Sequence, residues 1–323
     1  MPRAPIADCV MYNPREVFAF VARQQVQGKR VVLVTVTHTA GASVRNPGSH
    51  MAVGEDGSYA GSLSGGCIEA AVVGEAREVL RTGAPRQVRF GAGSPLIDVR
   101  LPCGGSVDLL FCEISDPALG ASTLERFDRR EAFALNLGLG VGPSIGSTTM
   151  TRFGIEYLGA QFRVTHVPQL RLALVGHAAA IDTLRELALA TGAEVAVISP
   201  DASLLDRSAQ SGCDAIKLAS TTFLPSLPLD RWTGVAILFH DHDWEPPVLE
   251  HVLVSEAFYV GAMGSHKTHE QRCATLRARG LENSKLDRIT APIGVIPSMR
   301  DPETLAISVL AEVIDRYNAA FLA

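Results

Sequence analysis

The chain has 323 residues, of which 47% are hydrophobic and 20% are charged, and its formal net charge is −5 at pH 7. This length favours two domains, and the apolar content excludes a globally disordered chain. The acidic balance, without any cluster of basic residues, argues against nucleic acid as a partner, and no stretch is apolar for long enough to span a membrane.

The six cysteines are scattered through a large chain, which is not the pattern of a disulfide framework. Reduced thiols in the cytosol are the better interpretation. Residues 1–12 contain no long apolar run and no cleavage-like site, so they do not form a secretory signal. The sequence therefore predicts a cytoplasmic protein. The cysteines are Cys9, Cys67, Cys103, Cys112, Cys213 and Cys273.

Residues 1–115 are predicted to form an N-terminal α+β domain with a mixed sheet. Asn13 and Pro14 are typical of a helix start, and the β-branched run 31–37 is typical of a buried strand. Apolar residues recur at helical spacing after Cys67, which predicts a second helix. Further strands are expected at 51–53, 58–61, 87–90 and 107–111, with a loop rich in turn formers at 39–48.

Residues 116–168 give a weaker pattern, and we interpret them as a connector with some strand. The segments 133–137 and 162–165 have the composition of strands. The run 138–146 is rich in glycine and resembles a loop.

From residue 169 to 323 the pattern changes to alternating strands and helices. This alternation predicts a Rossmann-like, doubly wound parallel sheet, in which ligands bind at the carboxyl ends of the strands. Strands are expected at 172–175, 195–198, 215–218, 235–239 and 258–260, and helices at 178–191, 247–254, 266–279 and 302–317.

Two short strings set a cysteine beside a pair of glycines: Ser64-Gly65-Gly66-Cys67 and Cys103-Gly104-Gly105-Ser106. Paired glycines let backbone amides approach a ligand closely, and a helix start such as the one after Cys67 favours anions and thiolates. The pair of strings predicts a site for an anionic, phosphate-bearing and metal-bearing small molecule. The alternative is that each cysteine is a small residue in a tight turn. Arg45, in the loop before these strings, is a candidate phosphate contact.

The first glycine loop of the C-terminal domain is incomplete as a dinucleotide-binding motif. Such a motif requires three spaced glycines, and only Gly176 is present, with the methyl group of Ala178 where a pyrophosphate would approach. Asp201, after the second strand, stands where an acid could meet a ribose. The sequence leaves open whether this fold binds a dinucleotide weakly or not at all.

Two further candidate sites lie at the carboxyl ends of later strands. In an extended segment alternate residues share a side, so His240 and His242 are candidate metal ligands, although a polar strand exit with helix capping explains the same residues. Gly264 and Ser265 open a helix and are a candidate anion site.

Read together, these strings resemble the XdhC/CoxI family of xanthine dehydrogenase accessory proteins, over nearly the whole chain. The two cysteine–glycine strings are intact. The family's Gly-Ala-Gly-His reads Gly176-His177-Ala178-Ala179 here, and its Gly-Ala-Arg-Thr reads Ser298-Met299-Arg300-Asp301. The matching strings are 39–43 with Arg45 and 47–48, then 61–69, 101–105, 240–242, 259–265, 291–294, 302–303 and 306–308.

The resemblance implies a maturation factor for the molybdenum cofactor (molybdopterin) rather than a metabolic enzyme. Family members bind and protect the cofactor, support its sulfuration by a cysteine desulfurase, and help to deliver it to a xanthine dehydrogenase-type hydroxylase. It implies that Gly65, Gly66, Gly104 and Gly105 hold the anion and that Cys67 or Cys103 contacts molybdenum. A homodimer is the expected assembly.

Two alternatives from other functional classes stay open. One is an NAD(P)-binding oxidoreductase that uses the C-terminal Rossmann-like domain. The other is a metal-dependent hydrolase that uses His240 and His242.

Overall fold

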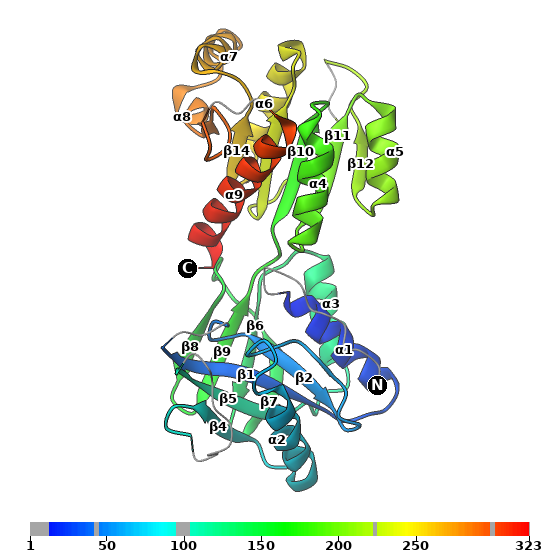
Figure 1. The fold of residues 1–323 in the computed structure, drawn as a ribbon, viewed down its shortest axis with the longest axis vertical. Helices are drawn as coiled ribbons and strands as arrows, with labels where there is room; N and C mark the ends of the chain where they lie inside the picture. The colour runs from blue at the N-terminus through cyan, green and yellow to red at the C-terminus, as the bar shows by residue number, and fades with distance from the viewer. Residues whose placement is uncertain (1–12, 42–44, 95–103, 222–224, 298–300, 323) are drawn as a thin grey trace. The chain divides into compact units, whose positions relative to one another are not determined.

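The computed structural model describes residues 13–41, 45–94, 104–221, 225–297 and 301–322. Contacts between residues divide the chain into two compact units, an N-terminal unit of residues 1–168 and a C-terminal unit of residues 169–323. Figure 1 labels the helices and strands of each unit.

A five-stranded sheet forms the first half of the N-terminal unit. Its strand order is β3-β2-β1-β5-β4, and all its neighbouring strands are antiparallel. The α+β class is therefore confirmed, but the expected mixed sheet is antiparallel, because the connections from β1 to β2 and from β4 to β5 return the chain in the opposite direction. The elements are α1 (Pro14–Val26), β1 (Val31–Ala40), β2 (His50–Gly54), β3 (Tyr59–Ala60), α2 (Glu69–Thr82), β4 (Arg86–Gly91) and β5 (Ser106–Glu113).

The central strand β1 is buried on both faces. Val31 and Leu33 contribute to a core shared with α1, while Val32 and Val34 contribute to a second core beneath α2. Because successive side chains of a strand point to opposite faces, every side chain of the covered part, residues 31–37, is buried. This explains the run of mostly β-branched residues in the sequence, in which the hydroxyls of Thr35 and Thr37 are hydrogen-bonded.

Residues 116–168 differ from the expected connector, because they form a helix and a complete sheet that belong to the N-terminal unit. The segment 138–146, expected as a loop, contains the strand β7. This strand lies at the edge of its sheet and contains Pro143, which an edge strand tolerates. The elements are α3 (Leu119–Asp128), β6 (Phe133–Gly138), β7 (Val141–Gly146), β8 (Gly154–Leu158) and β9 (Gln161–His166), in an antiparallel sheet of order β7-β6-β9-β8.

The C-terminal unit contains the predicted doubly wound sheet. Its six strands are parallel and have the order β12-β11-β10-β13-β14-β15. The elements are β10 (Arg171–Gly176), α4 (Ala180–Ala190), β11 (Glu194–Ser199), α5 (Ala202–Gln210), β12 (Asp214–Lys217), β13 (Thr233–Leu238), α6 (Glu245–Val254), β14 (Tyr259–Ala262), α7 (His266–Ala278), α8 (Asn283–Leu286), β15 (Ile289–Thr290) and α9 (Pro302–Phe321).

Helices cover this parallel sheet. On one face, alternate residues of β10, β11, β13 and β14 form a core with α6, α7 and α8. Helices α4 and α9 lie side by side and contact β10, β11 and β13 (Figure 1). The chain runs outward from β10 to β12 and returns to β13 on the other side of β10, so the topological switch point of the sheet lies between β10 and β13.

Helix α9 begins as the sequence predicts. The Asp301 side chain accepts a hydrogen bond from the Thr304 backbone N–H at 2.7 Å, and Pro302 occupies the first helical position. The helix has 20 residues, and no helix in the described part of the chain is both long enough and apolar enough to cross a membrane.

Substitution of Gly120 by alanine is expected to weaken the packing of α1 on α3. A Cβ at Gly120 would lie 2.5 Å from the backbone nitrogen of Ala22, and backbone cannot move aside cheaply. We expect Gly120→Ala to lower the free energy of unfolding of the N-terminal unit by about 1–3 kcal/mol, measured by urea denaturation. Gly74→Ala is the control, because Gly74 lies in α2 with no atom within 4 Å of its added Cβ. That control should stabilise the unit by about 0.5–1 kcal/mol. Equal effects of the two substitutions would contradict this account.

Candidate functional site

Three loops of the N-terminal unit meet at one end of the five-stranded sheet. The loop from β1 to β2 contacts the loop from β3 to α2, because Arg45 Nε donates to the Ser62 carbonyl oxygen at 3.0 Å. The same β1–β2 loop touches the segment before β5, where a Cβ on Gly41 would lie 3.1 Å from Gly105 Cα. The β1–β2 loop thus contacts Ser62, two residues before the string 64–67, and Gly105. Cys103 lies outside the described residues.

A buried carboxylate holds the loop from β3 to α2 in shape. Glu69, the first residue of α2, is 5% exposed. Its Oε1 accepts from Ser62 Oγ at 2.9 Å, Leu63 N at 3.1 Å and Ser64 N at 3.0 Å, and its Oε2 accepts from Ser64 Oγ at 2.7 Å and Ile68 N at 3.2 Å. An acid at the first helical position, after two serines, was the sequence signal for this role.

Ser64, Gly65 and Gly66 form a turn that ends at Cys67. Ser64 Oγ accepts from the Cys67 backbone N–H at 2.9 Å, and the Gly65 N–H donates to Ser62 Oγ at 3.1 Å. Gly65 and Gly66 have φ values of +75° and +110°, which side chains other than glycine rarely adopt. A Cβ at either glycine would meet no atom within 4 Å, so the space beside the turn is open. The Cys67 side chain is exposed.

This geometry changes the expected role of the glycine amides. The start of α2 is occupied by the protein's own carboxylate, so the helix dipole acts on Glu69. The Gly65 amide is likewise used inside the loop. The arrangement therefore presents an exposed thiol on a turn of fixed shape, with Arg45 in the adjoining loop.

The Glu69 carboxyl is ionised at neutral pH. Burial by itself raises the pKa of this carboxyl, but the hydrogen bonds from Ser64 and Ser62 outweigh it and lower the pKa to about 2. The hydrogen bonds of the loop therefore stabilise the ionised form of Glu69.

In the C-terminal unit, the Gly176 loop and Asp201, which the sequence offers as dinucleotide contacts, have structural roles. Gly176 has φ +143°, and a Cβ there would lie 2.1 Å from the Leu238 carbonyl oxygen, so this glycine lets β10 end close against β13. The Ala178 N–H donates to the same oxygen at 3.1 Å. Asp201 caps α5, and its Oδ1 accepts from the N–H groups of Ser203 at 2.8 Å and Leu204 at 3.3 Å.

The spacing argument for a metal site at 240–243 assumed an extended segment. Residues 242–244 instead form a turn of 3₁₀ helix, to which the alternation of strand residues does not apply. Asp241 Oδ1 accepts from the Asp243 N–H at 3.1 Å. Within the residues that the structure describes, no group of three or more His, Cys, Asp or Glu side chains could hold a metal ion.

Gly264 and Ser265 line a cleft of about 660 Å³ at the carboxyl end of β14. Ser265 Oγ accepts from the Thr268 N–H at 3.2 Å and caps α7. The opposite wall is residues 292–297, which α9 holds in place: Glu312 Oε2 accepts from the Gly294 N–H at 2.6 Å and from Tyr259 Oη at 2.7 Å. No sequence signal predicted this buried role of Glu312.

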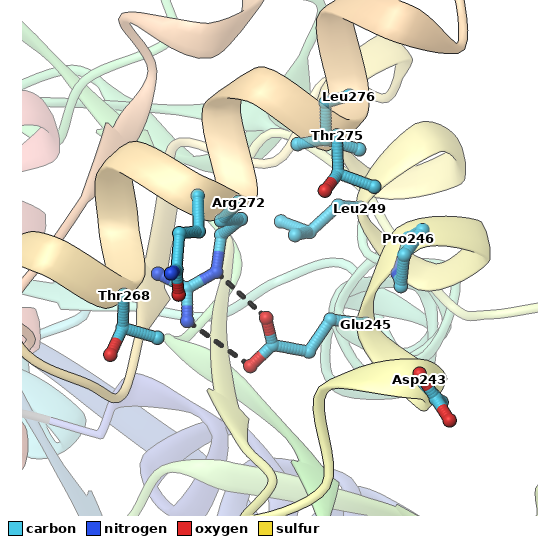
Figure 2. A pocket seen from close by; sticks show the side chains of 9 residues that line it. Asp243, Glu245, Pro246, Leu249, Thr268, Arg272, Thr275 and Leu276 are labelled. Atoms are coloured by element: carbon cyan, nitrogen blue, oxygen red, sulfur yellow. Dashed lines mark hydrogen bonds and ion pairs between the residues drawn. The ribbon is translucent and has the colours of Figure 1, made fainter.

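A smaller pocket of about 260 Å³ lies between α6 and α7 (Figure 2). Glu245 and Arg272 point toward one another there and form an ion pair at 2.8 Å, with each side chain 3% exposed. Arg272 Nη2 also donates to the Met263 carbonyl oxygen at 2.6 Å. This pair ties both helices to the end of β14, and a buried pair of this kind is costly to break from one side.

The fold and the site define a two-unit α/β protein that joins a thiol-presenting antiparallel unit to a Rossmann-like parallel sheet. Residues 25–91 match the XdhC and CoxI family, and residues 172–313 match the XdhC Rossmann domain. The chain belongs to the XdhC and CoxI family, as the sequence motifs predict.

Two known proteins resemble most of this chain. The molybdenum cofactor insertion chaperone PaoD of Escherichia coli is 34% identical over 299 residues, which cover 93% of this chain and 87% of that protein. The crystal structure of a xanthine dehydrogenase from Bacillus halodurans is 20% identical, with a TM-score of 0.75, and the match covers 95% of this chain and 97% of that chain. At this identity the second likeness demonstrates a shared fold.

Neutralising Glu69 is expected to destabilise the N-terminal unit in a pH-dependent way. Because folding lowers the Glu69 pKa from 4.5 to about 2, its charge contributes stability above pH 4.5 that is lost as the pH falls toward 2. We expect Glu69→Gln to lower the free energy of unfolding by about 3 kcal/mol at pH 7. The difference from the wild type should shrink between pH 4.5 and pH 2. The measurement is denaturant unfolding at several pH values.

The control for this prediction is Glu16→Gln, which removes an exposed acid from the first turn of α1. It should change the stability by less than about 0.5 kcal/mol. A Glu69→Gln protein as stable as the Glu16→Gln protein at pH 7 would contradict the role given to the carboxylate.

Proposed function

We propose that this protein binds the molybdenum cofactor and takes part in its maturation for a molybdoenzyme. The observation that carries the proposal is the 34% identity, across 93% of the chain, to a molybdenum cofactor insertion chaperone. The exposed thiol of Cys67, on a turn held rigid by Glu69, supports it independently.

The residues of the three-loop site suit such a cofactor. Molybdenum bound to dithiolene sulfur is soft, and a cysteine thiolate is a soft ligand. The open space beside Gly65 and Gly66 leaves room for a ligand above the turn, and the guanidinium of Arg45 matches a phosphate. When bound, the cofactor supplies the redox-active metal that a client enzyme needs. Arg45, Cys67, Gly104 and Gly105 would hold it, together with Cys103.

We further propose that the site serves a sulfuration step and delivery. In this proposal a cysteine desulfurase supplies the sulfur, and a xanthine dehydrogenase-type hydroxylase receives the finished cofactor. Family membership supports both partners. A homodimer in the cytoplasm is the proposed working form, and the scattered cysteines are consistent with a reducing compartment.

Removal of the Cys67 thiol is expected to abolish stable cofactor retention. The protein is incubated anaerobically with molybdenum cofactor and desalted, and the bound pterin is then quantified. We expect Cys67→Ala to retain at least about tenfold less pterin than the wild type, a loss in the range seen when a metal site loses a supporting group. Cys213→Ala is the matched control, because Cys213 is buried in the C-terminal unit.

A separate Cys103→Ala variant tests the second thiol. Retention that falls in Cys103→Ala but not in Cys67→Ala would move the metal contact to Cys103. No retention by the wild type would refute the proposed function.

A further inference from the structure

Two buried histidines join the two sheets of the N-terminal unit. His50 begins β2 in the five-stranded sheet, and His166 ends β9 in the four-stranded sheet. Their Nε2 atoms are 3.1 Å apart, and the side chains are 0% and 1% exposed. Thr35 Oγ1, on β1, lies 2.8 Å from His50 Nδ1. The proposed cofactor chemistry uses neither histidine.

The surroundings of the pair are aromatic. Among the groups that face it are Thr35 from β1 and four phenylalanine rings. Three of the ring centroids lie 5.1–6.0 Å from an imidazole centroid, and that of Phe127 lies 6.2 Å away. A positive charge on His166 would disfavour a proton on His50. The rings are Phe18 from α1, Phe127 from α3, Phe133 from β6 and Phe153 from the segment between β7 and β8.

This contact requires at least one neutral imidazole. A hydrogen bond between two Nε2 atoms needs a proton on one nitrogen and a lone pair on the other. If His166 Nε2 donates, the buried Nδ1 of His166 carries a lone pair without a partner. If His50 Nε2 donates, the same Nδ1 of His166 carries an N–H without a partner. The first arrangement costs less. Protonation of both rings removes the hydrogen bond and places two cations together in an apolar core.

Burial lowers the pKa of both groups, that of His166 to about 3, and the charge of His166 further lowers that of His50. A histidine that is neutral in the folded protein and has an ordinary pKa of 6.5 when exposed takes up a proton on opening. Its contribution to stability is complete above pH 6.5 and is lost progressively as the pH falls below that value.

The pair is adjacent to the candidate site. His50 directly follows the loop that carries Arg45, and the end of that loop rests on the four-stranded sheet. A Cβ on Gly48 would lie 2.9 Å from Phe153 Cζ and 3.2 Å from Val164 Cγ1. The loop also bonds to Ser62 through Arg45 and to β1, where the Gly48 N–H donates to the Val36 carbonyl oxygen at 2.7 Å. Because His50 continues this loop, separation of His50 from His166 would weaken the packing of the loop end on the four-stranded sheet.

We propose that the His50–His166 contact is an acid-sensitive joint that holds the Arg45 loop in its site-forming position, so that acidification loosens this loop and releases a ligand bound there. The release rests on the proposed function, whereas the loosening is a property of the chain alone. In a well-buffered compartment near neutral pH the joint stays closed and the site stays formed.

Hydrogen exchange of the full chain tests the joint without any cofactor. Protection factors for the peptide 45–66, corrected for the intrinsic pH dependence of exchange, are measured from pH 7 to pH 5. Each proton taken up on opening lowers the protection factor about tenfold per pH unit. Because the wild type takes up two protons, its protection factor should fall about 100-fold per pH unit below pH 6.5. His166→Phe should lose only about tenfold per unit, because one titrating ring remains.

His38→Phe is the control, since His38 is an exposed histidine on β1; it should behave as the wild type. A flat wild-type profile, or a His166→Phe profile as steep as the wild type, would overturn the joint. If His166→Phe does not fold, NMR titration of the wild-type imidazoles decides: both should remain neutral in the folded protein from pH 8 to pH 6, and a midpoint near 6.5 for either would overturn the proposal. Failure to retain cofactor at any pH would refute the proposed function while leaving these results in force.

Discussion

The N-terminal unit depends on one constraint, which is that β1 must be covered on both faces. Its alternate side chains enter two separate cores, one beneath α2 and one shared with α1, α3 and the four-stranded sheet. Because both cores use the same strand, residues 31–36 of β1 are packed from two sides. The loops that contain Arg45 and Gly105 follow or adjoin the other end of that strand, and Arg45 contacts the loop that leads to Cys67. The candidate site is therefore built on loops that are attached to a doubly packed strand.

The second constraint on the candidate site is the buried charge of Glu69. A carboxylate buried at a helix start is stable only when donors surround it, and Glu69 has five. The Gly65 and Cys67 amides also bond within the loop, to Ser62 and Ser64, and the turn presents the exposed thiol of Cys67. Glycine is required at positions 65 and 66 for the backbone conformation, and the absence of side chains there also leaves the space beside Cys67 open.

In the C-terminal unit, the loop after β10 is held against β13. Gly176 allows β10 to end against the carbonyl of Leu238, and the Ala178 amide donates to the same oxygen. A cleft of this unit lies beside β14, between α7 and a wall that Glu312 holds. Buried acids thus support both units: Glu69 shapes the Cys67 turn, Glu245 ties α7 to α6, and Glu312 fixes residues 292–297.

The sequence by itself determined the family, the parallel sheet and most helix starts, because these depend on local periodicity, capping residues and short motifs. For the same reason it predicted Cys67 and Arg45 as site residues, which stay a prediction. Only the tertiary structure decided that residues 116–168 complete the N-terminal unit, since an edge strand such as β7 buries too little to leave an alternating pattern. It also decided the roles of Glu69, Glu312 and the His50–His166 pair. Their hydrogen-bond partners come from other elements or from the turn geometry, and a buried polar side chain differs from an exposed one only in those partners.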